Sequence, residues 1–177
     1  MTAAVRLRHT HELDAGTRGG IRRLLDGAFD DLEDDDWEHA LGGVHALVTE
    51  GPDVVAHGSV VQRRLLHGGR ALRAGYVEAV AVRADRRRRG LGTSVMAALE
   101  GVARRAYDVA ALGATDEALP LYTGRGWQVW RGPLRALTPA GTVPTPDEAG
   151  AVLVLPLGVA LDLDAPLTCD WRDGDVW

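Results

Sequence analysis

A short basic stretch of this chain has the residue types and spacing that bind phosphate groups. Four consecutive arginines, residues 86–89, are followed at once by Gly90, Leu91 and Gly92. The stretch lies between an apolar run that predicts a buried strand and a segment with the apolar spacing of a helix. The first N–H groups of a helix attract anions, and glycines let the backbone approach the ligand. The pattern therefore predicts a phosphate-binding loop, with an exposed basic turn as the alternative.

Two well-known phosphate loops do not match this stretch. Ser94 and Val95 supply no third glycine for a dinucleotide fingerprint, and no Gly-Lys-Ser/Thr follows as in a P-loop. The pattern Arg/Gln-x-x-Gly-x-Gly/Ala does match, beginning at Arg87. With the sequence Leu-Tyr-Thr-Gly-Arg-Gly-Trp at residues 121–127, it makes the chain resemble the GNAT superfamily of N-acetyltransferases.

The resemblance implies a cosubstrate, acetyl-CoA, and the residues that hold it. The N–H groups of the loop would bind its pyrophosphate, and the preceding strand would lie along its pantetheine arm. The residues so assigned are Val80, Ala81, Val82, Arg87, Arg88, Arg89, Gly90, Leu91, Gly92 and Thr93. One departure is that many members have glycine where this chain has Arg88, which puts one backbone contact in doubt.

Two side chains are candidates for moving protons. An amine must lose a proton before it can attack a thioester, so a nearby carboxylate helps as a general base. Glu78 precedes Val80 and Val82 on one strand, and alternation predicts that the three share a face. The resemblance assigns to Tyr122 the donation of a proton to the CoA thiolate. The alternatives are that Glu78 pairs with an arginine and that Tyr122 packs as a core ring.

Segments along the whole chain resemble one family within this superfamily, the aminoglycoside 2′-N-acetyltransferases. These segments are residues 37–39, 42–46 and 61–64, and the terminal nonapeptide 169–177, which is the most specific. The resemblance implies acetylation of the 2′-amine of these antibiotics, hence resistance, and a homodimer. Another amine, such as a cell-wall amino sugar or a polyamine, stays open as the substrate, and so does a non-catalytic CoA-binding role.

Acidic groups suit an acceptor that carries several ammonium groups, because they form charge-assisted hydrogen bonds. Residue-by-residue matching gives the acceptor contacts as Asp31, Asp36, Glu78, Glu148, Asp175 and the terminal carboxylate of Trp177, which also counts among the catalytic groups. For the acidic segment 30–38, a solvated loop with helix-capping aspartates is the alternative.

The elements that must position these residues follow from hydrophobic periodicity. We expect strands at residues 5–9, 44–49, 54–66, 71–82, 110–112 and 152–155, and helices at 14–29, 93–107 and 116–125. Residues 130–150, which contain four prolines, are expected to be irregular. His45 and His57 fall within strands and are expected to be packed or half-exposed rather than catalytic. The tail from residue 161 carries Trp171 and Trp177, so we expect it to dock near the acceptor site.

Composition narrows the class of protein. A chain of 177 residues with 46% hydrophobic residues can bury a core, and the net charge of −5 argues against binding to duplex nucleic acid. The single cysteine, Cys169, cannot form an internal disulfide and offers no metal site. With no membrane-span or signal-peptide pattern, we expect a cytoplasmic protein without membrane or nucleic-acid partners.

These observations predict an α+β fold in one domain over residues 1–177. The resemblance implies a GNAT domain with a mixed, mostly antiparallel central sheet, flanking helices, and acetyl-CoA bound at a splayed strand.

Overall fold

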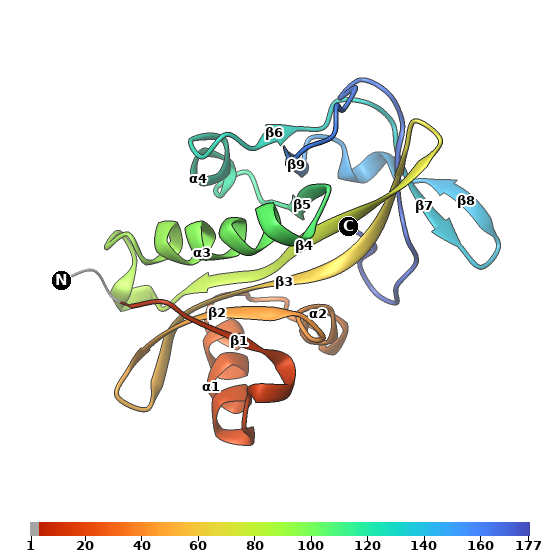
Figure 1. Ribbon diagram of the computed structural model, residues 1–177. Helices are drawn as coiled ribbons and strands as arrows, with labels where there is room; N and C mark the ends of the chain where they lie inside the picture. Colours follow the sequence, from red (N-terminus) through yellow and green to blue (C-terminus); the bar gives the residue numbers. More distant parts are fainter. Residues whose placement is uncertain (1–3) are drawn as a thin grey trace. The chain divides into compact units, whose positions relative to one another are not determined.

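The computed structural model describes residues 4–177, and its contacts divide the chain into two compact units. The first consists of Met1–Val61 and Val77–Val102, and the second of Gln62–Tyr76 and Ala103–Trp177. Two long strands, β3 (Asp53–His67) and β4 (Arg70–Val82), contribute residues to both (Figure 1). The single domain over residues 1–177 stays a prediction, and residues 1–3 of it lie outside the described range.

The first unit is an antiparallel meander with helices on both faces. β1 (Arg6–His9) pairs with β2 (Val44–Glu50), which pairs with β3. Figure 1 shows α1 (Ala15–Asp26) on one side of these strands and α3 (Leu91–Ala106) on the other. A short helix, α2 (Asp34–His39), and the 3₁₀ turns η1 (Thr10–Glu12) and η2 (Ala84–Arg86) complete the unit.

Apolar periodicity explains how α1 packs. Ile21, Leu24 and Leu25 are buried and form a cluster with Leu47 and Val54 from the strands. Asp14 caps the helix, because its side chain accepts a hydrogen bond from the backbone N–H of Thr17 at 2.7 Å. The other face of the meander packs so closely on α3 that a Cβ on Gly58 would lie 2.9 Å from Val95.

The second unit contains most of the strands. Their order is β6-β9-β5-β4-β3-β10-β7-β8, with β4–β5 and β10–β7 parallel and the other recorded pairings antiparallel. The bounds are β5 (Val109–Gly113), β6 (Gln128–Val129), β7 (Leu134–Thr138), β8 (Gly141–Pro144), β9 (Val152–Pro156) and β10 (Leu167–Cys169). The predicted mixed, mostly antiparallel sheet of an α+β fold is confirmed.

Two of the predicted elements are wrong. Residues 130–150, expected to be irregular, contain the antiparallel hairpin β7–β8, with Thr138 opposite Gly141, followed by η3 (Pro146–Glu148). Pro144 is accommodated at the end of β8, the last strand in the sheet order, where its missing N–H disturbs no central ladder. The helix expected at residues 116–125 is only α4 (Leu119–Thr123), because Gly124 and Gly126 follow it.

Candidate functional site

The basic loop has a backbone path that leads into the N-terminus of α3. Arg88 and Gly90 both have positive φ, 61° and 78°. The backbone N–H of Ser94 then donates to the carbonyl of Gly90 at 3.0 Å, which closes the first turn of the helix. The earlier N–H groups, of Leu91, Gly92 and Thr93, have no intrahelical acceptor at a helix start. The loop and helix together can therefore receive an anion.

The arginines of this loop differ in what they contact. Arg86 forms ion pairs with Asp85 and with Glu50, the latter at 2.8 Å, so it ties the loop to the end of β2. Arg87 donates from Nε to the carbonyl of Val82 at 3.3 Å. Arg88 and Arg89 are exposed, and neither pairs with an acidic residue within residues 4–177. Their charge is therefore available to an anionic ligand.

The positive φ of Arg88 bears on the departure from the family pattern, in which many members have glycine at this position. A φ of 61° is the left-handed conformation that glycine adopts without strain. Arg88 takes this conformation although it has a Cβ, at a cost of about 1 kcal/mol. The backbone path that a glycine would give is therefore retained.

The strand before the loop is not regular. Ala79 has φ of 50°, so the alternation that we assumed from Glu78 to Val82 is interrupted one residue after Glu78. Val80 lies within reach of α3, because its Cγ2 would be 3.2 Å from a Cβ on Gly58, beside Val95 and Leu99. Ala81 is buried in the cluster around α1. Glu78 is half-buried, and its sharing a face with Val80 stays a prediction.

A chain of buried hydrogen bonds reaches the same point of β4. His57 Nδ1 lies 2.9 Å from the carbonyl oxygen of Ala79, and His57 Nε2 lies 2.9 Å from His45 Nδ1. His45 Nε2 is in turn 2.8 Å from the hydroxyl of Thr10. Burial lowers the pKa of His57 to about 3 and that of His45 to about 4. Both histidines are packed as expected, but the sequence did not reveal that they meet. The available signal was their position on adjacent strands of a predicted meander.

In the second unit, Tyr122 is a buried proton donor candidate. It lies on α4, and its ring meets Trp127 edge-on with centroids 6.2 Å apart. Its backbone carbonyl also accepts from the N–H of Trp127. Burial raises the pKa of its phenol to about 12. The phenol therefore keeps its proton at neutral pH, as proton donation requires, although the ring also packs as the alternative predicted.

The C-terminal tail docks on the second unit through an arginine that sequence reasoning did not single out as functional. Arg63, on β3, is only 4% exposed. Its Nε donates to the carboxylate of Asp170 at 2.7 Å, and its Nη2 donates to the carbonyls of Asp170 and Val176 at 2.9 and 2.8 Å. Its guanidinium also lies over the Tyr76 ring, 4.6 Å from the centroid. An arginine facing inward on a strand was the signal that could have indicated this anchor.

The same docking fixes the last residue. Trp177 is buried, and its indole N–H donates to the Thr145 hydroxyl at 2.8 Å. Its backbone N–H donates to the carboxylate of Asp175 at 3.0 Å. Arg172 donates to the terminal oxygen of Trp177 at 2.9 Å. The terminal carboxylate proposed for the acceptor is therefore held in place, and one of its oxygens already has a cationic partner.

Glu148 and Asp175 influence each other in this unit. Burial, followed by the charges of Asp175 and Asp147, raises the pKa of Glu148 above its usual value. A cation bound near Glu148 would favour its charged form. The structure thus brings together three of the predicted acceptor contacts, Glu148, Asp175 and Trp177.

The acidic segment of the first unit is partly structural. Asp36 lies in the first turn of α2, and its carboxylate accepts from the backbone N–H of Glu33 at 2.9 Å, as in a helix cap. Asp34 pairs with Arg22 at 2.9 Å. Asp31 is exposed in the loop before α2. The capping alternative therefore describes one oxygen of Asp36, and the acceptor contacts of Asp31 and Asp36 stay predictions.

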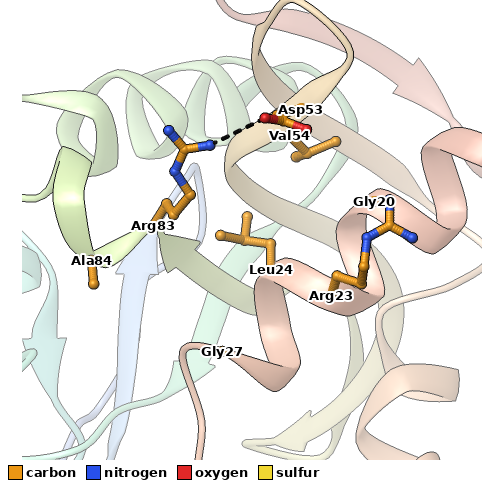
Figure 2. Close-up of a pocket in the computed structure, with 8 residues that line it drawn as sticks. All are labelled: Gly20, Arg23, Leu24, Gly27, Asp53, Val54, Arg83 and Ala84. Carbon is orange, nitrogen blue, oxygen red and sulfur yellow. Dashed lines mark ion pairs between the residues drawn. The ribbon is translucent and has the colours of Figure 1, made fainter.

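One cavity of the first unit lies between α1 and the start of η2. It has a volume of about 300 Å³ and is lined by Arg23, Leu24, Val54 and Arg83, among others. Figure 2 shows Arg83 turned toward Asp53, with which it forms an ion pair at 3.6 Å. Because Arg83 is also paired with Asp85 and Glu50, and no predicted site residue lines the cavity, we assign it no role.

Two kinds of feature are absent from residues 4–177. No group of three or more histidine, cysteine or acidic side chains is arranged to hold a metal ion. None of the helices in that range is long and apolar enough to cross a membrane.

Comparison with known proteins gives a consistent result. A family model described as an acetyltransferase (GNAT) domain matches residues 10–130. An aminoglycoside 2′-N-acetyltransferase from Mycolicibacterium fortuitum is 53% identical over 97% of this chain and 91% of its own. Among solved structures, the Escherichia coli GNAT acetyltransferase YhbS in complex with CoA is 19% identical with a TM-score of 0.62, over 94% of this chain and 89% of its own. A Kribbella flavida GCN5-related N-acetyltransferase has a TM-score of 0.59 and 21% identity over 73% of this chain, which spans only 34% of that protein.

Proposed function

We propose that this chain acetylates the 2′-amine of aminoglycosides. The premise is that it belongs to the GNAT acetyltransferases and, among them, to the aminoglycoside 2′-N-acetyltransferase family. The acetyl donor of this family is acetyl-CoA. The similarity to the Mycolicibacterium fortuitum enzyme carries the choice of acceptor, because it extends over 97% of this chain. The proposal implies that the protein confers resistance to these antibiotics.

The loop fits the pyrophosphate of acetyl-CoA on two grounds. Its backbone is held open by positive φ at Arg88 and Gly90, and exposed guanidinium groups flank a helix N-terminus. Beyond the loop, the recorded pairing of β4 with β5 ends at Tyr76, opposite Ala111. β5 itself continues to Gly113, where it pairs with β9. The backbone of Val80 and Val82 would follow the extended pantetheine arm.

Acetyl-CoA supplies a thioester carbon that is open to attack by a neutral amine. Glu78, directly or through water, would accept the proton that the ammonium group of the acceptor must lose. Tyr122 would donate from its phenol, which is protonated at neutral pH, to the departing thiolate. Backbone N–H groups of β4 would stabilise the negative charge that develops on the acetyl oxygen.

The acceptor would be held by carboxylates. The family resemblance gives them as Asp31, Asp36, Glu148, Asp175 and the terminal carboxylate of Trp177. Each ammonium group of an aminoglycoside can form charge-assisted hydrogen bonds with such oxygens. A different amine, such as a cell-wall amino sugar or a polyamine, is the second candidate, because the same acids would bind it.

Thiol release from acetyl-CoA tests this proposal with purified protein. We expect turnover with tobramycin and gentamicin, which carry a 2′-amine, and none with spermidine or glucosamine. Turnover with spermidine or glucosamine alone would keep the acetyltransferase and discard the antibiotic. Binding of CoA without turnover of any amine would favour a non-catalytic role.

A homodimer and a cytoplasmic location belong to the same proposal. The family resemblance supports the dimer, and a single buried cysteine is compatible with a reducing compartment. Sedimentation equilibrium of the full chain tests the first, and a monomer at micromolar concentration would contradict it.

A further inference from the structure

The carbonyl of Ala79 makes an unusual hydrogen bond for a residue within a strand. Ala79 adopts φ of 50°, and its carbonyl accepts from the side chain of His57 on the neighbouring strand β3 at 2.9 Å. A left-handed alanine is strained and persists only where its surroundings hold it. His57, which is fully buried, is the group positioned to do so.

The carbonyl of Ala79 fixes the direction of each hydrogen bond in the series that runs through His57 and His45 to Thr10. A carbonyl oxygen can only accept, so His57 carries its hydrogen on Nδ1, and its Nε2 must accept from Nδ1 of His45. His45 Nε2 then accepts from the Thr10 hydroxyl at 2.8 Å, and the backbone N–H of Gly42 donates to the same hydroxyl at 2.9 Å. The lowered pKa values of both buried histidines agree with neutral rings. Each ring is thus fixed in one tautomer.

Fixing this carbonyl also fixes an N–H group. The carbonyl of Ala79 and the N–H of Val80 belong to one planar trans peptide, in which the two bonds point in opposite directions. With the carbonyl held by His57, the N–H of Val80 points away from His57. Under the proposed function, Val80 is one of the β4 residues whose backbone meets the acetyl thioester.

We propose that His57, oriented by His45 and Thr10, is a positioning residue that aims the Val80 N–H at the acetyl oxygen. This inference rests on the proposed function. It makes the histidine pair part of the catalytic apparatus although neither ring touches substrate.

Two substitutions of His57 separate positioning from packing. In H57N the amide nitrogen replaces Nδ1 and can still donate to Ala79, whereas in H57Q it replaces Nε2 and cannot. We expect H57Q to lower kcat by at least about tenfold, as for a misaligned oxyanion donor, with KM for both substrates changed less than about threefold. H57N should recover most of kcat. Equal losses in the two variants, or a wild-type kcat in H57Q, would overturn the proposal.

A measurement without substrate provides an independent readout. Amide hydrogen exchange by NMR in the ligand-free protein should show faster exchange and a shifted resonance at Val80 in H57Q, with values near wild type in H57N. If H57Q does not fold, T10V serves instead, because it removes only the hydroxyl at the far end and should give a smaller shift at Val80 in the same direction. An unchanged Val80 resonance in both variants would refute the positioning role.

The outcomes distinguish this inference from the proposed function. Affinity for CoA, which lacks the acetyl oxygen, should be the same in wild type and H57Q. A wild-type protein that binds no CoA or turns over no amine would overturn the proposed function and the catalytic role of His57 with it. The exchange experiment would still decide whether His57 holds the β4 peptide.

Discussion

Ala79 is the residue at which the backbone of the candidate site departs most from regular structure. Its φ of 50° lies inside β4, and it packs against the cluster around α1. Glycine should be tolerated here, because relief of strain offsets its loss of strand preference. Valine should destabilise the protein by about 2 kcal/mol, because a β-branched side chain resists positive φ.

Chemical denaturation and steady-state kinetics check this pair of variants. We expect A79G to keep both the unfolding free energy and kcat close to wild type, and A79V to lose both. If A79V were as stable and active as A79G, the kink would have no structural importance.

The buried histidines give a second prediction, for acid pH. Their folded pKa values, about 3 and about 4, lie below the ordinary histidine pKa of 6.5. The unfolded chain therefore binds more protons as the pH falls below 6.5, and stability is lost. At pH 5 each histidine should cost about 2 kcal/mol relative to pH 7 or above.

Thermal unfolding of wild type and H45Q/H57N at pH 7 and pH 5 checks this dependence. The difference between the two pH values should be smaller in the double variant, and H11Q, at an exposed position, serves as the control. Nearby His9 and Arg18 also disfavour protonation of His45, and both remain in every variant. An equal pH effect in all three proteins would contradict the assignment of neutral rings.

At the scale of elements, the basic loop depends on backbone conformation more than on side-chain identity. R88G should keep CoA affinity within about threefold of wild type, because glycine adopts the observed φ of 61° without strain, which offsets the loss of one exposed charge. G90V should lower it by at least about tenfold, because valine cannot adopt φ of 78° without moving the loop. Isothermal titration with CoA measures both, and unchanged affinity in G90V would refute the phosphate loop.

The sequence predicted the long elements well. β2, β3, β4, α1 and α3 begin and end within three residues of the predicted bounds, because alternation and helical periodicity are strong over such lengths. The hairpin β7–β8 was missed because its prolines outweighed a short alternating pattern in which Leu134 and Ala136 face inward. The kink at Ala79 could not be predicted, because no glycine marks it.

The site was predicted unevenly for a similar reason. Loop residues were identified from local spacing, and the acidic and terminal residues from resemblance. The His45–His57 contact depends on the register of two strands, and the Arg63 anchor joins residues more than 100 positions apart in the sequence. No local pattern encodes either of them.

At the scale of the whole molecule, Arg63 joins a central strand to the end of the chain. R63M would leave Asp170 and the carbonyl of Val176 without their buried donor, which should cost about 3 kcal/mol. If the tail contacts the acceptor, KM for tobramycin should rise while KM for acetyl-CoA stays unchanged. The control is R64M, because Arg64 is exposed and its recorded hydrogen bonds to Asp170 are made by its backbone N–H and carbonyl.

Kinetics of these two variants would separate a binding role from a merely structural one. A rise in KM for both substrates in R63M would show general loss of structure rather than loss of an acceptor contact. An unchanged KM for tobramycin with a released tail would remove Trp177 and Asp175 from the acceptor site.

The most direct test of acetyl transfer to the 2′-amine compares kanamycin B with kanamycin A, which differ in bearing an amine or a hydroxyl at the 2′ position. The measurement is thiol release from acetyl-CoA by the purified full chain at equal concentrations of either antibiotic. We expect turnover of kanamycin B and no release above background with kanamycin A. Equal turnover of the two would show that another amine is acetylated and would contradict the proposed acceptor site.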